Sequence, residues 1–170
     1  MRSHIGTAQT AREHKDSLSH ADFERLRHLI YAESGIHLGA AQLGLTRAAE
    51  RKRFYGYSTR GRKDFDFFCS TGHHGIRVGY SHGRAVLILS SNSRYHLGAI
   101  KPGSRLAKAE RELKIYTHFK LGLNTWYLSR GKSASGVLKV RHGQVQEIGI
   151  ASKSLTRTLK SARHLFANIP

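Results

Sequence analysis

Aromatic side chains alternate with Lys and Arg in the second half of the chain. An exposed ring can stack on a nucleobase while neighbouring cations neutralise phosphates, so this combination is typical of surfaces that bind single-stranded nucleic acid. The candidate nucleic-acid-binding residues are Lys114, Tyr116, Lys120, Trp126, Arg130 and Lys132. The alternative is that these aromatic side chains lie in the hydrophobic core, where large rings of strands usually pack.

A second group of cations lies in the first half, within one and a half turns of an expected helix. It consists of Arg47, Arg51, Lys52 and Arg53. Like charges at this spacing repel and destabilise a helix unless an acidic group compensates for them. The cluster is therefore a candidate binding site for an acidic partner.

Residues that could support catalysis are scarce. Residues 75–170 contain no Asp and have only three glutamates, which are Glu110, Glu112 and Glu147. A Ser-His-carboxylate triad would have to use Glu147, and nothing selects a serine or histidine to accompany it. Three histidines, His73, His74 and His82, have no cysteine or carboxylate nearby at a metal-ligand spacing. The glycines of 75–83 lack the G-x-G-x-x-G spacing. The sequence predicts no catalytic residue, cofactor site or metal site.

The charge balance favours an anionic partner. The 170-residue chain has 29 Lys and Arg against 11 Asp and Glu, a net charge of +18. The imbalance is concentrated in residues 75–170, with 17 basic and 3 acidic side chains, against 12 and 8 in residues 1–74. Such a field attracts phosphates and acidic protein surfaces. One cysteine, no apolar run of membrane-spanning length and no apolar leader near Met1 predict a cytoplasmic location without membrane insertion.

The first half has the periodicity of helices. Residues 1–17 are polar and aperiodic, which predicts a flexible tail. A cap at Ser19, an apolar stripe every three to four residues and Gly35 predict a helix over 20–34. We expect a second helix over 40–54 and a short third helix through 64–69. The first expected unit after the tail is therefore a helical region over 18–71.

From Gly75 onward the pattern changes to the two-residue period of strands. Expected strands are 76–80, 85–89, 113–119, 124–128, 136–141 and 144–150, and a helix is expected over 153–167. His142-Gly143 predicts a two-residue hairpin loop that places Val140 opposite Val145, and a slip in apolar parity predicts a bulge between Val145 and Ile148. The predicted fold class is α+β: a small N-terminal helical region, then an antiparallel β-meander with a closing C-terminal helix over 72–170.

The stretch LSHADFERLRHLIYAESGIHLG, residues 18–39, resembles the N-terminal helical domain of bacterial chemotaxis receptor (protein-glutamate) methyltransferases, with a weaker resemblance to residue 69. The resemblance implies a small all-helical domain whose basic second helix docks on acidic receptor methylation helices, a role that would fall to Arg51, Lys52 and Arg53. It also implies a following S-adenosylmethionine domain. Too few residues remain after residue 74 for that domain, so no cofactor is expected.

The C-terminal part resembles a module of uncharacterised actinobacterial proteins over about residues 75–168, on the segments NTWYL and VLKVRHGQVQEIGIA. That resemblance implies a domain boundary near residue 72 and no activity. The leading hypothesis from the sequence is a non-catalytic protein that binds acidic partners. The alternatives are a nucleic-acid-binding protein that uses the basic aromatic sheet, and a truncated protein-glutamate O-methyltransferase.

Overall fold

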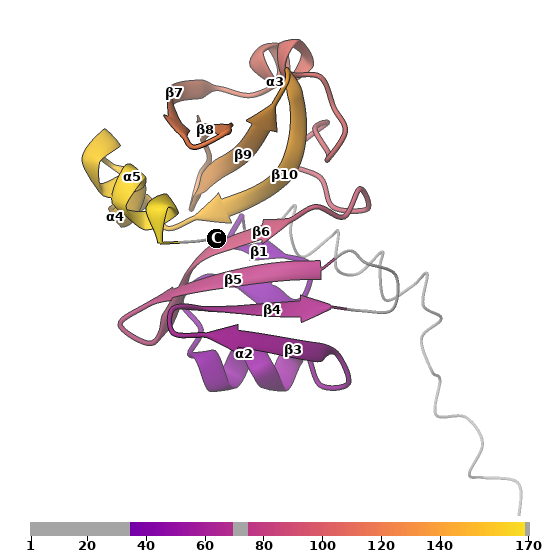
Figure 1. The fold of residues 1–170 in the computed structure, drawn as a ribbon, viewed down its shortest axis with the longest axis vertical. Helices are drawn as coiled ribbons and strands as arrows, with labels where there is room; N and C mark the ends of the chain where they lie inside the picture. The colour runs from indigo at the N-terminus through magenta and orange to yellow at the C-terminus, as the bar shows by residue number, and fades with distance from the viewer. Residues whose placement is uncertain (1–34, 70–74, 169–170) are drawn as a thin grey trace, which may run out of the picture.

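A computed structural model describes residues 35–69 and 75–168 (Figure 1). Within these ranges, eight strands form one antiparallel sheet in the order β3-β4-β5-β6-β10-β9-β8-β7, and two short strands form a separate hairpin. The strands are β1 (His37–Leu38), β2 (Ala41–Gln42), β3 (Ser58–Arg62), β4 (Phe65–Cys69), β5 (Gly75–Ser81), β6 (Arg84–Ser90), β7 (Ile115–Leu121), β8 (Asn124–Arg130), β9 (Ser135–Arg141) and β10 (Gln144–Ala151). The helices are α2 (Arg47–Arg53), α3 (Leu106–Glu112), α4 (Lys153–Thr156) and α5 (Leu159–Ala167).

The expected fold class is wrong, because the sheet begins well before residue 72. The helix predicted over 64–69 is strand β4, which pairs with β3 on one side and with β5 on the other. Its aromatic residues follow a two-residue period: Asp66 and Phe68 are buried on one face, while Phe65 and Phe67 lie on the other. The predicted helix over 40–54 is reduced to α2, and the one over 20–34 lies outside the described residues.

The pairing predicted for the last strands is confirmed. Val140 lies opposite Val145 across the His142-Gly143 loop, and the register shifts between Val145 and Glu147. The predicted closing helix is divided into α4 and α5, because a new cap forms between them. The Thr158 side chain accepts a hydrogen bond from the Ser161 backbone N–H, and the Ser161 side chain accepts one from the Thr158 backbone N–H.

The described chain consists of two copies of one structural repeat. His-Leu-Gly-Ala occurs at 37–40 and again at 96–99, and each copy is followed by a seven-residue helix, α2 or α3, and a four-stranded meander. His-Gly occurs at 82–83 and at 142–143, where both histidines have positive φ, 49° and 50°. Equivalent residues are therefore 59 positions apart in the segments that precede β3 and β7, and 60 apart in the last hairpin of each repeat.

The backbone contacts of the two repeats also match. Gly44 N–H donates to the Ala85 carbonyl at 2.8 Å, and its equivalent Gly103 donates to the Val145 carbonyl at 2.8 Å. The β5–β6 and β9–β10 hairpins each contain a register shift at the equivalent place. The repeats join through β6 and β10, where Leu89 lies opposite its own equivalent, Gly149. The two halves are therefore related by an approximate twofold axis through that pair.

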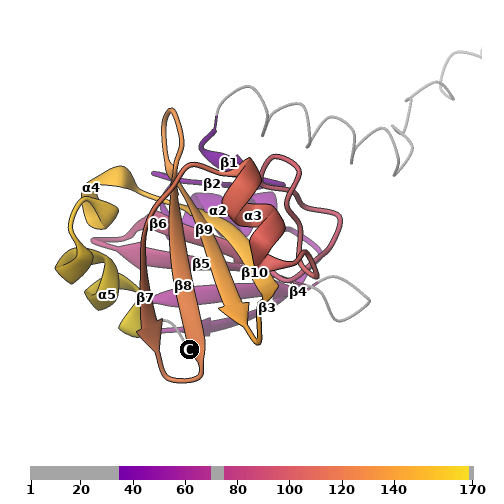
Figure 2. The ribbon, with the colours of Figure 1, turned by 90° about the horizontal axis from the view of Figure 1, so that it is seen from above.

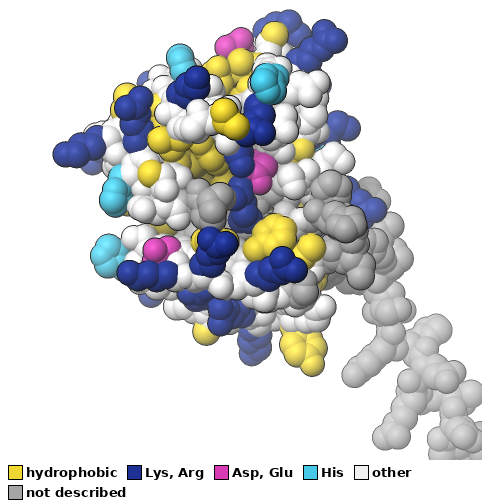
Figure 3. Space-filling model, in the orientation of Figure 1, with side chains coloured by type: hydrophobic (Ala, Val, Ile, Leu, Met, Phe, Trp, Pro, Cys, Tyr) yellow, Lys and Arg dark blue, Asp and Glu magenta, His cyan; other side chains and the backbone are white. Residues whose placement is uncertain are grey.

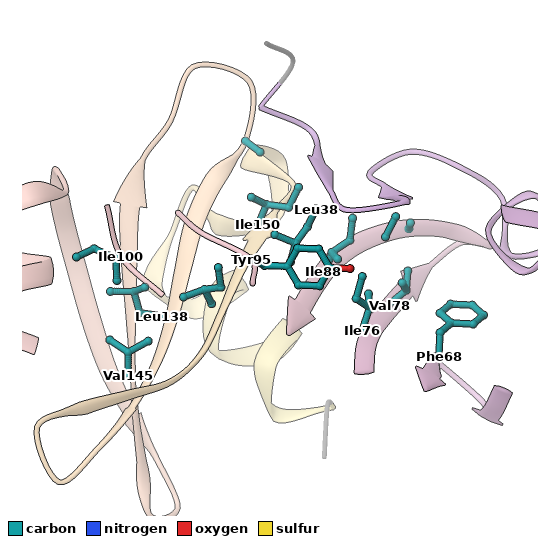
Figure 4. Close-up of a cluster of buried hydrophobic side chains, with 14 of the residues drawn as sticks. Leu38, Phe68, Ile76, Val78, Ile88, Tyr95, Ile100, Leu138, Val145 and Ile150 are labelled. Carbon is teal, nitrogen blue, oxygen red and sulfur yellow. The ribbon is translucent and has the colours of Figure 1, made fainter. Parts of the chain in front are cut away.

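Two hydrophobic cores lie on opposite faces of the sheet. The larger core, on what we call the first face, combines side chains from both repeats, including Phe68, Ile88, Leu138 and Ile150 (Figure 4). The segments β1, β2, α2 and α3 pack against this face (Figure 2). The smaller core lies on the second face, where Ala162 and Phe166 of α5 cover residues of the second repeat. No helix within the described residues covers the second face of the first repeat in this way.

Candidate functional site

The uncovered part of the second face carries arginines and phenylalanine rings together. The register of β3, β4 and β5 places Arg60 beside Phe67 and then Arg77, and places Arg62 beside Phe65. Arg60 and Arg62 are exposed, whereas the phenylalanines and Arg77 are half-buried. We call these five residues the basic aromatic face. The Arg62 guanidinium carbon lies 5.9 Å from the centroid of the Phe65 ring, within cation–π range.

Positive charge continues from this face into the second repeat. Glu147 of β10 forms ion pairs with Arg77 of β5 and, at 3.0 Å, with Lys139 of β9. The Lys139 ammonium also lies 5.6 Å from the Trp126 ring centroid. Figure 3 shows Lys and Arg side chains in a column across this side of the molecule, with an apolar patch between them over the lower half. The single carboxylate in this network is shared by two cations, so it leaves an excess of positive charge.

The two repeats use equivalent positions of the second face differently. Strand register makes Phe65 equivalent to Trp126, and Arg62 equivalent to Phe119. In the second repeat, Phe166 of α5 covers both aromatic rings, with centroid distances of 4.6 Å to Trp126 and 5.6 Å to Phe119. The first repeat keeps an aromatic ring at one of these positions and has arginine at the other.

The same difference recurs one row along the sheet. Phe67 is equivalent to Leu128, which is fully buried beneath α5, and Arg77 is equivalent to Val137, which is also buried. Strand β4 thus has apolar residues at positions that α5 covers in the second repeat, whereas the flanking strands β3 and β5 have cationic residues. This arrangement can bind a ligand that has both apolar groups and negative charge.

The four cations predicted to bind an acidic partner divide into two pairs. Arg47 and Arg51 both bind the fully buried carboxylate of Asp66, with shortest distances of 2.6 and 2.9 Å. Arg47 also donates to the backbone carbonyls of Arg62, Lys63 and Phe65, so it holds the β3–β4 hairpin against α2. The remaining pair, Lys52 and Arg53, is exposed, and Arg53 donates to the Ala40 carbonyl at 3.3 Å.

Asp66 is the acidic group that compensates for the charge crowding on α2. Burial alone would raise the pKa of Asp66, but hydrogen bonds from Arg47 and Arg51 outweigh burial and lower this pKa to about 2. The Tyr80 hydroxyl donates to the same carboxylate at 3.3 Å. Burial raises the pKa of Tyr80, and the adjacent Asp66 charge raises it further. Asp66 therefore stays ionised and Tyr80 neutral at physiological pH.

The six residues predicted to bind nucleic acid are not brought together on one surface. Trp126 is 4% exposed because it packs beneath Phe166, so its ring is not open for stacking. Lys120 lies opposite Thr125 in the register, which places it on the first face, whereas its neighbour Phe119 lies opposite Trp126 on the second. Lys114 and Lys132 are exposed. Tyr116 and Arg130 stay together, with the guanidinium carbon 5.7 Å from the ring centroid, and they line a shared cavity.

The ranges 35–69 and 75–168 contain neither a candidate metal site nor a candidate membrane-spanning helix. No cluster of three or more His, Cys, Asp or Glu side chains with the arrangement of a metal site occurs there. None of the helices in those ranges is both apolar enough and long enough to cross a bilayer.

The fold of this chain is similar to that of known bacterial structures, but the sequence identity is low. No family model matches the chain, and no curated protein matches it either. Three bacterial structures resemble its fold, and one of them aligns over nearly its whole length. This is a DUF4309 family protein (YjgB) from Bacillus subtilis, with a TM-score of 0.51 and 13% identity over 77% of this chain and 95% of that one.

The other two structures are larger. One is an extracellular protein containing a SCP domain from Bacillus anthracis, with a TM-score of 0.46 and 10% identity over 68% of this chain. The other is a cysteine-rich secretory protein from Staphylococcus aureus, with a TM-score of 0.47 and 9% identity over 70% of this chain. The present chain spans 46% of the length of each.

These findings correct both resemblances inferred from the sequence. The similar structures are not chemotaxis methyltransferase domains, and β3 and β4 occupy part of the region where the methyltransferase-like helical domain was expected. The resemblance of residues 75–168 to an actinobacterial module likewise finds no matching family model.

Sequence reasoning missed all five members of the basic aromatic face. The signal that could have found them is the alternation of arginine at 60 and 62 and of phenylalanine at 65 and 67. Residues with a two-residue spacing share one face of a strand. We interpreted 64–69 as a helix, and a helical period would have separated Phe65 from Phe67.

Proposed function

We propose that this protein binds an acidic protein partner through the basic aromatic face, and that the partner contributes apolar side chains as well as carboxylates. The observation that supports this proposal most strongly is the comparison between repeats. The second repeat covers its face with α5, whereas on the equivalent face of the first repeat Phe65 and Phe67 are half-buried and no helix of residues 35–69 or 75–168 covers them.

The chemistry of the partner follows from the residues around the rings. Arginine and phenylalanine are both enriched where protein interfaces bury their strongest contacts. Arg60 and Arg62 are exposed, and guanidinium groups bind carboxylates in paired, bidentate geometry. A partner segment with an apolar stripe could cover the phenylalanines as α5 covers Trp126, while flanking Asp or Glu side chains reach the arginines. The sheet supplies a rigid frame for such contacts.

The proposal can be tested with two labelled acidic peptides of equal charge, one with leucine and phenylalanine at helical spacing and one with alanine at those positions. We expect fluorescence anisotropy to show tighter binding of the apolar peptide. Replacing Arg60 and Arg62 by glutamate should weaken its binding at least about tenfold, and the effect should shrink as salt is raised.

A matched control removes the same charge from the other side of the molecule. Lys108 and Arg111 are exposed on α3, which packs against the first face. Replacing them by glutamate makes the same change in net charge and should leave most of the binding intact. If both double variants lose affinity equally, the attraction is a general effect of the +18 net charge and the proposed site is refuted.

Single-stranded nucleic acid is a second candidate for the same face, because the Arg62 guanidinium lies against the Phe65 ring. A ring with an adjacent cation can hold a base and its phosphate. Anisotropy titration with a labelled single-stranded oligonucleotide separates the candidates. Tighter binding of the oligonucleotide than of the apolar acidic peptide, lost on replacing Phe65 and Phe67 by alanine, would favour the nucleic-acid hypothesis over the leading proposal.

A further inference from the structure

A cavity of about 650 Å³ opens between the ends of β7, β8 and β9 and the short helix α4. Its volume lies within the range of small-molecule binding pockets. The lining residues are Tyr116, Arg130, Gly131, Ser135, Lys153, Ser154, Thr156 and Arg157. Three of these side chains are cationic and none is acidic.

The cations of the cavity are not neutralised by other described residues. Lys153 donates to the Lys132 backbone carbonyl at 2.6 Å, a contact that fixes its ammonium without cancelling its charge. Arg130 contacts the Tyr116 ring, and neither it nor Arg157 pairs with a carboxylate among the described residues. Three positive charges around one cavity repel each other, and an anion bound between them would relieve this repulsion.

The cavity wall is held in place by buried polar contacts. The Tyr116 hydroxyl donates to the Thr156 backbone carbonyl at 3.0 Å, and this bond orients the Tyr116 ring that the Arg130 guanidinium contacts. The buried hydroxyls of Ser135 and Thr156 are hydrogen-bonded to each other at 2.8 Å. These bonds link β7, β9 and α4, so Arg130 at the end of β8, Lys153 of α4 and Arg157, which directly follows α4, surround a fixed wall. A fixed frame reduces the ordering cost of binding.

We propose that this cavity binds the phosphate group of a small phosphate monoester. Phosphate offers several acceptor oxygens and up to two negative charges, which suits two guanidinium groups and one ammonium group. The cavity is larger than a phosphate ion, and the Tyr116 ring at its wall can contact the organic part of the ester. The site is separate from the basic aromatic face and does not depend on the function proposed for that face.

The test is calorimetric titration of the full chain with a nucleoside monophosphate and with the unphosphorylated nucleoside, at constant ionic strength. We expect the monophosphate to bind and the nucleoside to bind far more weakly. Replacing Arg130 and Arg157 by glutamine should weaken monophosphate binding at least about tenfold. The matched control, in which Lys108 and Arg111 are replaced by glutamine, should bind as the wild type does.

A further titration, with a 5′-phosphorylated and an unphosphorylated dinucleotide, identifies the source of the phosphate. Tighter binding of the phosphorylated dinucleotide than of the monophosphate would assign the cavity to a nucleic-acid end, and the reverse would assign it to a free metabolite. Absence of monophosphate binding at millimolar concentration, or an equal loss in the control variant, would overturn the proposal. Circular dichroism of both variants checks that they remain folded.

Discussion

Replacing Glu50 by glutamine should change how the stability of this protein depends on pH. Glu50 of α2 is fully buried, and its Oε1 accepts a hydrogen bond from the Gln42 backbone N–H at 2.8 Å. Its Oε2 has no hydrogen-bond partner among the described residues. Burial raises the pKa of Glu50 to about 7, although the Gln42 hydrogen bond and the Arg53 charge oppose this change.

The sign of the effect follows from proton binding. An exposed glutamate has a pKa of 4.5, so between pH 4.5 and about 7 the folded protein retains a proton that the unfolded chain releases. The contribution of Glu50 to stability is therefore greatest below pH 4.5 and is lost as pH rises through about 7. Converting the pKa difference and discounting it for solvent screening gives a loss of about 1–3 kcal/mol.

Urea unfolding between pH 4.5 and 8 measures this contribution as the difference between wild type and variant. The difference is needed because His37 acts in the opposite direction: burial lowers its pKa, so its contribution to stability is lost as pH falls below 6.5. Glutamine keeps the acceptor for Gln42 and cannot ionise, so the variant should gain stability over the wild type as pH rises. Glu110→Gln on the exposed side of α3 should show no such gain. A wild-type-minus-variant difference that does not change with pH would refute the reasoning.

Three other substitutions test the frame of the molecule. Asp66→Ala should cost about 2–4 kcal/mol in denaturant unfolding, because it leaves two guanidinium groups without their carboxylate, and a loss under about 1 kcal/mol would contradict that role. Phe166→Ala should cost about 3–5 kcal/mol and shift Trp126 fluorescence to the red, and unchanged emission would show that α5 does not cover the indole. Gly149→Ala should lower the melting temperature, since an added Cβ would lie 2.1 Å from the Ile88 carbonyl oxygen, and an unaltered melting curve would mean that the strands separate freely at this point.

The second half of the fold could be predicted because its strands have local signals. Alternating apolar residues and the His142-Gly143 turn determine the β9–β10 hairpin within a few residues of chain. The β3–β4 hairpin has a weaker signal: Phe65 and Phe67 have the two-residue spacing of a strand, but Phe68 directly follows Phe67, and Asp66 is acidic in a strand. Its stability depends on Arg47 and Arg51, which come from a helix 15 to 19 positions earlier. Contacts of this kind depend on the tertiary fold, so local periodicity does not show them.

The candidate site was harder to predict than the fold. Cations at 47 and 51 were correctly noted as needing a compensating acid, but the sequence did not identify Asp66 as that acid. From the sequence, aromatic rings such as Trp126 and Tyr116 are more often buried than stacked on a base, and the position of Phe166 shows that the Trp126 ring is buried. The repeat itself was visible in the two His-Leu-Gly-Ala segments, but their spacing of 59 would have aligned Phe65 with Asn124, and only the strand register makes Phe65 the counterpart of Trp126.

The junction between β6 and β10 has a consequence for a shortened chain. Each repeat contributes its last strand to the junction, and the two strands run antiparallel around Leu89 and Gly149. One repeat produced alone would expose that strand's unpaired amide and carbonyl groups along its whole length. Since the contact is nearly symmetric, two copies of the second repeat, which would place Gly149 opposite Gly149, could pair there and rebuild an eight-stranded sheet as a homodimer. Separating the halves would thus replace an intramolecular strand pairing by an intermolecular one, whose extent depends on protein concentration.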